Sequence, residues 1–490
     1  MRKIQAENDS VINYNSKLKD KTDFTNKLRV TTYFLIPFLI GVIIKIIIFN
    51  NAIINHGNLF IGNYSSELFW DIQNVEFYDD FNYYSLNFVN YFLSGELPYT
   101  HFFYINPEPN AFMTYGPLLI YPPLYLYIIS MFGNNLFWNV ALPVLIFDIL
   151  TSYLVFKISF KLWKNRIFSV IACLIYLLNP LNIIYIDYYW LNTSIFTFFL
   201  MVSIYFLIDD RFYLSILFLS LSIMCKQFAG IFLIIILIRM SKRMQDLKLS
   251  KIVQFKKYIK TLSFLFIPIA LFSLPYILPY YPDFPDYIFH ILAVGGFDFN
   301  LNLPSYSVPI DFSIPFIALE LNYNFLYIIK WIIEYYVLLI GITILICCIY
   351  SFFIKRNKFY NKNTLIITLI LLISMTLFFP RGFYKYYTIL FIPLMSILIM
   401  KNLKNHGWNH WKNNSSEIII DIISIGIYFF FSISILYIHR YFTPLLLLSM
   451  IIYYSFYGYV NFSLLLKKVF RIYSRIIYKT YEKYQDRITF

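Results

Sequence analysis

Long apolar stretches alternate with short basic clusters along most of the chain. A transmembrane helix needs about 20 consecutive apolar residues, and the first such stretch runs from about residue 30 to residue 49. Further spans are expected at about residues 136–156, 167–186, 188–208, 262–280, 326–354, 364–379, 386–400, 417–438 and 443–465. The pattern therefore predicts an all-α, polytopic membrane protein.

Two apolar stretches do not fit a single crossing. Residues 118–132 are short and contain Pro122 and Pro123, so we expect a re-entrant or interfacial helix there. Residues 212–239 have basic residues at both ends, which predicts two short broken helices that return to the same side, with Lys226 and Gln227 at their outward tip. The expected total is about twelve transmembrane helices.

Basic residues also predict the orientation, because cytoplasmic loops are enriched in Lys and Arg. The segment before residue 30 is basic, whereas residues 51–117 and 281–325 contain no Lys or Arg and several acidic residues. We therefore expect both termini in the cytoplasm and two outward loops that carry short interfacial helices. The transmembrane domain would cover residues 1–466, and residues 467–490 would form a basic cytoplasmic tail helix.

Composition supports a membrane protein. Only 13% of the residues are charged, against about 25% in soluble domains, and the mean hydropathy is +0.63. The net charge of +14 is divided among clusters between apolar runs, so nucleic acid is not an expected partner. The expected location is a plasma membrane in a prokaryote or the endoplasmic reticulum in a eukaryote.

The first outward loop contains the most informative motif. Asp79 and Asp80 precede a helical apolar pattern over residues 81–94, then Gly95-Glu96-Leu97-Pro98-Tyr99 and Tyr121-Pro122-Pro123-Leu124 follow. An aspartate pair also suits the N-terminus of a helix, where the helix dipole stabilises it. The order of these pieces resembles the glycosyltransferase C superfamily, and is similar to the catalytic subunit of GPI mannosyltransferase I and to bacterial polyprenol-phosphate-mannose mannosyltransferases.

The resemblance implies an inverting membrane glycosyltransferase. It would move a hexose, mannose first among them, from a polyprenyl-phosphate sugar to a glycan, glycolipid or protein acceptor on the extracytoplasmic face. Asp80 would be the catalytic base, with Asp79 in reserve or orienting the acceptor. The two aspartates are adjacent rather than spaced by one residue, so a role for a divalent metal such as Mg²⁺ or Mn²⁺ stays open, and no other cofactor is expected.

Cations in outward segments are the candidates for binding the donor phosphate, because charge-assisted hydrogen bonds suit that group. They are Arg381, Lys385, Lys226 with its neighbour Gln227, and Arg440. The alternative is that these side chains extend to lipid headgroups. Tyr99, Tyr121, Asp187, Asn192 and His290 are expected to line the pocket for sugar and acceptor.

Two other classes of function remain open from the sequence. One is a polytopic transporter or lipid-glycan flippase, and the other is a glycan polymerase or ligase. Transporters tend to place charged residues near the membrane midplane, whereas acidic residues here cluster in the two outward loops. Asp148, which lies within a predicted span, is expected to be a buried, paired carboxyl group.

Overall fold

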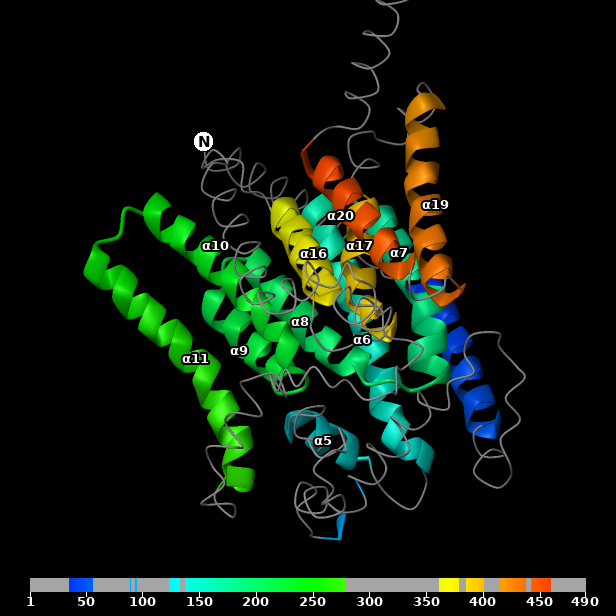
Figure 1. Cartoon of the computed structure of the whole chain (residues 1–490), viewed down its shortest axis with the longest axis horizontal. Helices are drawn as coiled ribbons and strands as arrows, with labels where there is room; N and C mark the ends of the chain where they lie inside the picture. Colours follow the sequence, from blue (N-terminus) through cyan, green and yellow to red (C-terminus); the bar gives the residue numbers. More distant parts are fainter. Residues whose placement is uncertain are drawn as a thin grey trace, which may run out of the picture.

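The computed structural model describes residues 35–55, 89, 93–94, 123–132, 137–277, 361–378, 385–400, 415–437 and 442–459. These residues form helices and the turns between them, and no strand occurs within the described ranges. The expected all-α class is confirmed for this part of the chain (Figure 1).

The first span, Leu35–Asn55, packs against the other helices along one face. Its buried positions recur every three or four residues, as on one face of an α-helix: Gly41, Lys45, Phe49 and Ala52. Its opposite face exposes a row of isoleucines: Ile36, Ile40, Ile43, Ile47 and Ile54. The helix is therefore docked on one side and presents an apolar surface on the other.

Four helices form the centre of the bundle. They are α6 (Phe137–Trp163), α7 (Arg166–Leu177), α8 (Thr193–Ile208) and α17 (Phe391–Ile399). Every residue of α17 is buried, as expected for a short helix that is apolar on all sides. The Trp163 indole of α6 donates a hydrogen bond to the Ile397 carbonyl at 2.9 Å, so the two helices are joined by a polar contact as well as by packing.

Other helices surround this centre (Figure 1). On one side of the centre, α9 (Phe212–Ile223) packs against α8 and α11. The helix α10 on this side follows a short 3₁₀-helix, η5. On the other side, α16 packs against α17 and α20, and α19 contacts α17. The short α5 rests on α6. Their bounds are α5 Pro123–Ser130, α9 Phe212–Ile223, η5 Gln227–Phe232, α10 Leu233–Asp246, α11 Lys251–Ile277, α16 Asn361–Phe378, η8 Lys385–Leu390, α19 Ser415–Tyr437 and α20 Thr443–Tyr459.

Three of the described helices are long and apolar enough to cross a membrane: Leu35–Asn55, Asn139–Trp163 and Lys251–Leu274. A fourth span is obtained if α7 and the π-helix η4 (Asn182–Tyr188), which are bent by 61° relative to each other, are counted together. The described residues therefore establish three or four membrane-capable helices and not the expected twelve. The expected span at 326–354 and both outward loops lie outside the described ranges, apart from a few residues of the first loop.

The expected span at residues 167–186 is present as a bent pair of helices, α7 and η4. The α-helix α7 ends at Leu177, because Pro180 lacks a backbone N–H and cannot continue the helical hydrogen bonding. The Asn179 side chain accepts a hydrogen bond from the Leu181 N–H at 2.9 Å and starts the next segment. The expected break within residues 212–239 is confirmed, with Lys226 between α9 and η5. α5, with eight residues, is too short to cross a bilayer.

Candidate functional site

Three ionisable side chains meet in the interior of the bundle. The Lys45 ammonium lies 2.6 Å from Asp148 Oδ2 and 2.6 Å from Asp187 Oδ2. None of the three side chains has any exposed surface. We call this cluster the ion triad. It joins the first span, α6 and η4, three segments that are well separated in the sequence.

Local structure places each member of the triad. Asp148 lies in the middle of α6, and Asp187 lies near the end of η4, a π-helix. Such helices are rare and often occur at functional sites. Immediately after η4, Trp190 has a left-handed backbone with φ of 55°, which is strained for a residue with a large side chain. Its indole donates to the Asp187 carbonyl oxygen at 3.1 Å and so fixes this turn.

The electrostatics of the triad require its members to stay together. A lysine at the centre of a bilayer costs about 2.5–3.5 kcal/mol on insertion scales, and a buried charge is tolerated only when it is paired. The Tyr176 hydroxyl of α7 donates a further hydrogen bond to Asp148 Oδ1 at 2.6 Å. Asp187 Oδ1 is buried and has no hydrogen-bond partner among the described residues. One ammonium group thus faces two carboxyl groups, and Asp148 receives the additional donor.

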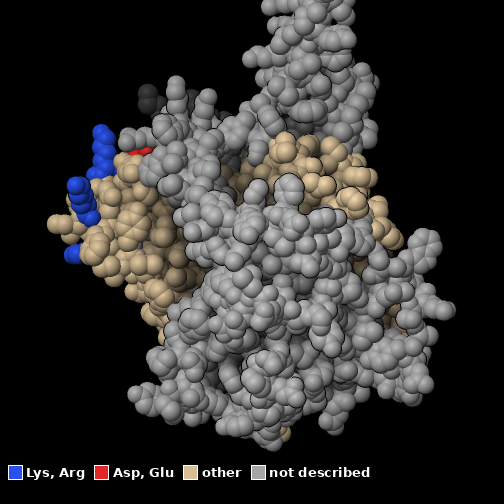
Figure 2. Space-filling view, viewed as in Figure 1, with Lys and Arg blue, Asp and Glu red and all other residues tan. Residues whose placement is uncertain are grey.

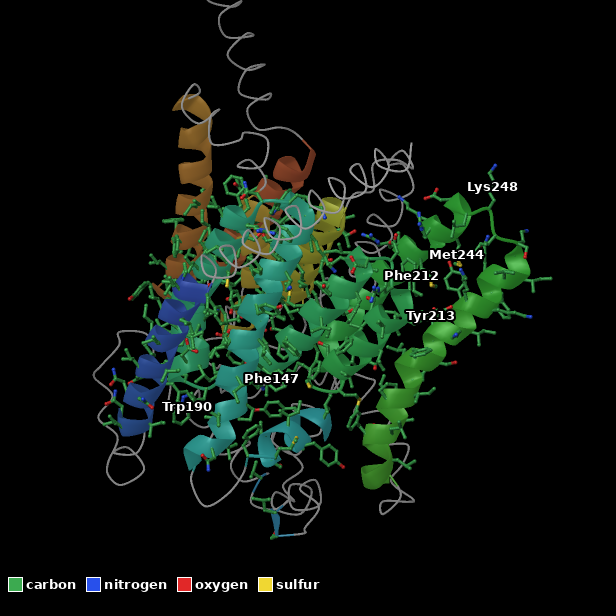
Figure 3. All side chains as sticks on the ribbon, turned by 180° about the vertical axis from the view of Figure 1, so that it is seen from behind. Phe147, Trp190, Phe212, Tyr213, Met244 and Lys248 are labelled. Carbon is green, nitrogen blue, oxygen red and sulfur yellow. The ribbon has the colours of Figure 1, made fainter. Side chains whose placement is uncertain are left out.

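Neighbouring contacts extend this docking along the first span. The ring of Phe49 lies 5.4 Å from the ring of Trp190, and Trp190 is labelled beside the first span in Figure 3. Further along the helix, the Asn55 amide donates to the Tyr188 hydroxyl at 3.2 Å. At the other end, a Cβ on Gly41 would lie 2.8 Å from Leu177 Cδ1, so glycine lets the helix approach α7 closely. Contacts on both sides of the triad therefore hold the first span in place.

The arrangement suits holding helices together better than reacting with a substrate. All three triad side chains are fully buried, and the Lys45 ammonium contacts both carboxyl groups. A lysine paired with two carboxyl groups is held as an ammonium ion and has no free electron pair for attack on a substrate. No cluster of three or more His, Cys, Asp or Glu with metal-binding geometry occurs among the described residues. We interpret the triad as a structural device.

Three residues expected to bind substrate are described by the structure, and all three are buried. Asp187 is part of the ion triad. Asn192 is buried just before α8, and its side-chain oxygen has no hydrogen-bond partner in the described part of the chain. Lys226 is also buried, with its ammonium 5.1 Å from the centre of the Tyr387 ring. That distance corresponds to a cation–π contact, so Lys226 does not lie at an exposed tip.

The remaining expected site residues lie outside the described positions. They are Asp79, Asp80, Tyr99, Tyr121, His290, Arg381 and Arg440, together with the side chains of Gln227 and Lys385. Conversely, sequence reasoning missed Lys45, the centre of the triad. A signal was present, because a lysine flanked by Ile43, Ile44, Ile46 and Ile47 requires a buried partner. Asp148 is buried and paired, as expected.

Part of the chain matches a known family. The family model of the GPI transamidase subunit PIG-U matches residues 110–283. This region covers about a third of the chain, includes all residues from α5 to α11, and contains Asp148 and Asp187. A search of curated proteins finds no match.

The match corrects the functional expectations. The matching family model describes a subunit of the GPI transamidase and not a glycosyltransferase. The expected membership of the glycosyltransferase C superfamily is therefore wrong, and so is the predicted mannosyltransferase activity. The predicted partners, a polyprenyl-phosphate sugar and a glycan or lipid acceptor, are wrong for the same reason. The match supports neither a transporter or flippase nor a polymerase or ligase. The motif that begins at Asp79 and Asp80 consists of short pieces, and the expectation of glycosyltransferase chemistry rests on their order alone. Such an order does not identify a reaction.

Proposed function

We propose that this chain is a membrane subunit of a GPI transamidase. The observation that carries the proposal is the family match over residues 110–283, which includes all residues from α5 to α11. The buried ion triad supports a structural role, because its charged groups are used to hold helices together. A transamidase exchanges one amide bond for another, and this chain would supply the membrane-embedded framework for that reaction.

The substrate class follows from the chemistry of GPI attachment. A protein that receives a GPI anchor carries a C-terminal signal that ends in a hydrophobic tail of about 10–20 residues, and this tail is removed. Such a tail is apolar, and a bundle of apolar helices in the same membrane is a suitable neighbour for it. The partners of this chain would then be the other transamidase subunits and proteins with this type of signal.

The location and topology that fit this function are those of a multi-pass protein of the endoplasmic reticulum membrane. The described helices provide three or four membrane-capable segments, and the apolar pattern over the whole chain predicts about twelve. The basic residues of the α6–α7 and α10–α11 turns would face the cytoplasm. The lysine-free residues 51–117 and 281–325 would face the lumen.

The proposal is tested by depleting the chain from its own cells and following two quantities. One is the fraction of a reporter protein that keeps its C-terminal GPI signal, and the other is the pool of GPI lipids labelled with radioactive mannose. Loss of a transamidase subunit should leave the reporter uncleaved while complete GPI accumulates. Re-expression of the wild-type chain, as the control, should restore cleavage.

Two outcomes would contradict the proposal. The reporter could be processed at the normal rate in depleted cells, which would remove the chain from the reaction. Alternatively, GPI intermediates that lack sugars could accumulate, which would place the defect in the synthesis of the lipid and not in its attachment.

A further inference from the structure

The hairpin formed by α10 and α11 carries a dense cluster of positive charge. Residues 239–260 contain eight Lys and Arg residues and a single acidic residue, Asp246. Figure 2 shows Lys and Arg side chains together at one edge of the described surface, and Figure 3 shows Lys248 at the tip of the hairpin, away from the bundle. The function proposed above leaves this surface without a role.

The hairpin is an ordered structure. Arg239 anchors α10 through hydrogen bonds to Asp210 Oδ1 at 2.9 Å and to the Ile208 carbonyl at 3.2 Å. Burial lowers the pKa of the Arg239 guanidinium from its ordinary value, and the neighbouring Asp210 carboxylate partly offsets this effect. Arg239 therefore makes its hydrogen bonds within the protein. Binding of a partner to the hairpin would depend on its other cations.

The connection between the two helices is also fixed. The Lys248 backbone is left-handed, with φ of 50°, and its N–H donates to the Gln245 carbonyl at 3.0 Å. Beyond the turn, the Gln254 amide donates to the Leu249 carbonyl at 2.7 Å. Thr261 of α11 donates to the sulfur of Met240 in α10 at 3.4 Å. The positions of the cations on this hairpin are thus set by the fold.

Five other cations of the hairpin are exposed: Arg243, which also lies 3.7 Å from Asp210, Lys248, Lys251, Lys256 and Lys260. Apolar side chains of α11 are exposed beside them. Ile252 is 70% exposed, Phe255 64% and Ile259 50%, and their spacing of three and four residues places them on one helical face. A surface that combines ammonium groups with exposed large apolar side chains is unusual for a region that faces only water.

The length of α11 places this surface at the edge of the membrane. Its 27 residues extend about 40 Å at 1.5 Å per residue, which exceeds the hydrocarbon thickness of about 30 Å. Lys260 is the last cation of the helix, and its ammonium lies 4.8 Å from the centre of the Tyr213 ring. Tyr213 in turn contacts Phe264. Aromatic side chains of this kind are enriched at membrane interfaces, so residues 251–260 belong at headgroup depth.

We propose that the α10–α11 hairpin binds the anionic headgroups of the membrane in which the protein is embedded. The exposed ammonium groups complement phosphate and carboxylate charge, and each is favourable near an anionic leaflet. The neighbouring apolar side chains enter the boundary of the acyl chains while the lysines reach outward. An acidic segment of another protein would match the charge but would leave the apolar row of Ile252, Phe255 and Ile259 exposed.

The test uses the purified full-length chain in lipid nanodiscs. The discs contain phosphatidylcholine with one fifth phosphatidylserine, and the same photoactivatable acyl chain is attached to one lipid or the other in parallel samples. After illumination, crosslinks to residues 247–260 are counted by peptide mass spectrometry. We expect the labelled phosphatidylserine to exceed labelled phosphatidylcholine, corrected for abundance, by at least about threefold. The excess should fall at high salt because exposed charges are screened.

Variants make the test specific to the hairpin. Lys251→Gln/Lys256→Gln should reduce the excess, and addition of Lys248→Gln and Lys260→Gln should remove it. The matched control, Lys164→Gln/Arg166→Gln, also removes two exposed cations, from the α6–α7 turn, and should leave the excess at residues 247–260 unchanged. An equal yield from both lipids in the wild-type protein would overturn the proposal. So would an unchanged excess in the fourfold variant.

Discussion

The Lys45 ammonium and the Asp187 carboxylate lie 2.6 Å apart although 142 positions separate them in the sequence. The contact joins the first span to the π-helix that follows α7, and Asp148 of α6 completes it. Because all three side chains are fully buried, removal of Lys45 leaves two carboxyl groups without their cation where water cannot reach them. The docking of the first span is therefore expected to depend on the ion triad.

Lys45→Met should strongly destabilise the protein. The substitution leaves two carboxyl groups buried without their cation, and breaking a buried pair in this way costs about 3–5 kcal/mol. Thermal unfolding of the purified chain in a mild detergent would measure the loss. Ile47→Met is the control, because this residue lies on the exposed face of the same helix and should change stability by less than about 0.5 kcal/mol.

Removing the two carboxyl groups together with Lys45 should recover most of that stability. In Lys45→Met/Asp148→Asn/Asp187→Leu no charge remains in the cluster, and the amide introduced at position 148 can still accept the hydrogen bond from Tyr176. Replacement of a buried ion cluster by neutral groups is often close to neutral in energy, so the triple variant should regain at least half of the loss. If it were no more stable than Lys45→Met, charge balance would not explain the effect of the single substitution.

Tyr176→Phe tests the additional donor to Asp148. The substitution removes the hydroxyl that lies 2.6 Å from Asp148 Oδ1 and leaves a buried acceptor without this partner. The expected cost is about 1–3 kcal/mol, since hydrogen bonds to charged groups contribute more than neutral ones. The same unfolding assay applies, with Tyr437→Phe as the control at a largely exposed tyrosine. Equal stability of the two variants would show that the hydroxyl contributes nothing.

Two glycines should respond in opposite ways to a larger residue. A side chain on Gly41 would press on Leu177, whereas a Cβ on Gly426 would meet nothing within 4 Å. Gly41→Leu should destabilise the protein by about 1–3 kcal/mol through overpacking, and Gly426→Leu should be neutral or stabilising by up to about 1 kcal/mol through helix propensity. A destabilising Gly426→Leu with a neutral Gly41→Leu would contradict the close approach of the first span to α7.

Arg239→Lys tests the anchor of α10. Arg239 donates to Asp210, the Ile208 carbonyl and the Thr364 hydroxyl, and a lysine ammonium cannot reproduce this planar set of donors. We expect a loss of about 2 kcal/mol and faster proteolysis of the α10–α11 turn. Arg243→Lys, at a more exposed position beside Asp210 with a longer contact of 3.7 Å, should have little effect.

Much of the helical framework could be predicted from apolar runs alone. The expected spans at 364–379 and 417–438 correspond closely to α16 and α19, because each run is bounded by polar segments. The expected span at 167–186 is found as two helices, α7 and η4, which bend at Asn179 and Pro180. The helices α6 and α11 extend beyond the expected spans at 136–156 and 262–280 and include Lys157 and Lys251, because long lysine side chains can reach water from within a helix.

The ion triad was harder to predict for a physical reason. The sequence shows that Lys45 and Asp148 each need a partner, but which groups pair is decided by the packing of three helices that no local pattern connects. Asp148 was recognised as a carboxyl group that must be paired, since a charge within a span demands a partner. Lys45 was counted only as part of an apolar run, and Asp187 was assigned to a pocket because it follows a predicted span. Function could not be predicted from short motifs, because their order alone does not specify a reaction.

The most direct measurement of the central claim is the amount of the catalytic transamidase subunit that co-purifies with the tagged full-length chain from its native membranes. We predict near-equal amounts with the wild-type chain and with Ile47→Met, and a marked loss with Lys45→Met, because the first span is then no longer held in place. Purification of the intact wild-type chain without any transamidase subunit, under conditions that preserve the complex itself, would contradict the account.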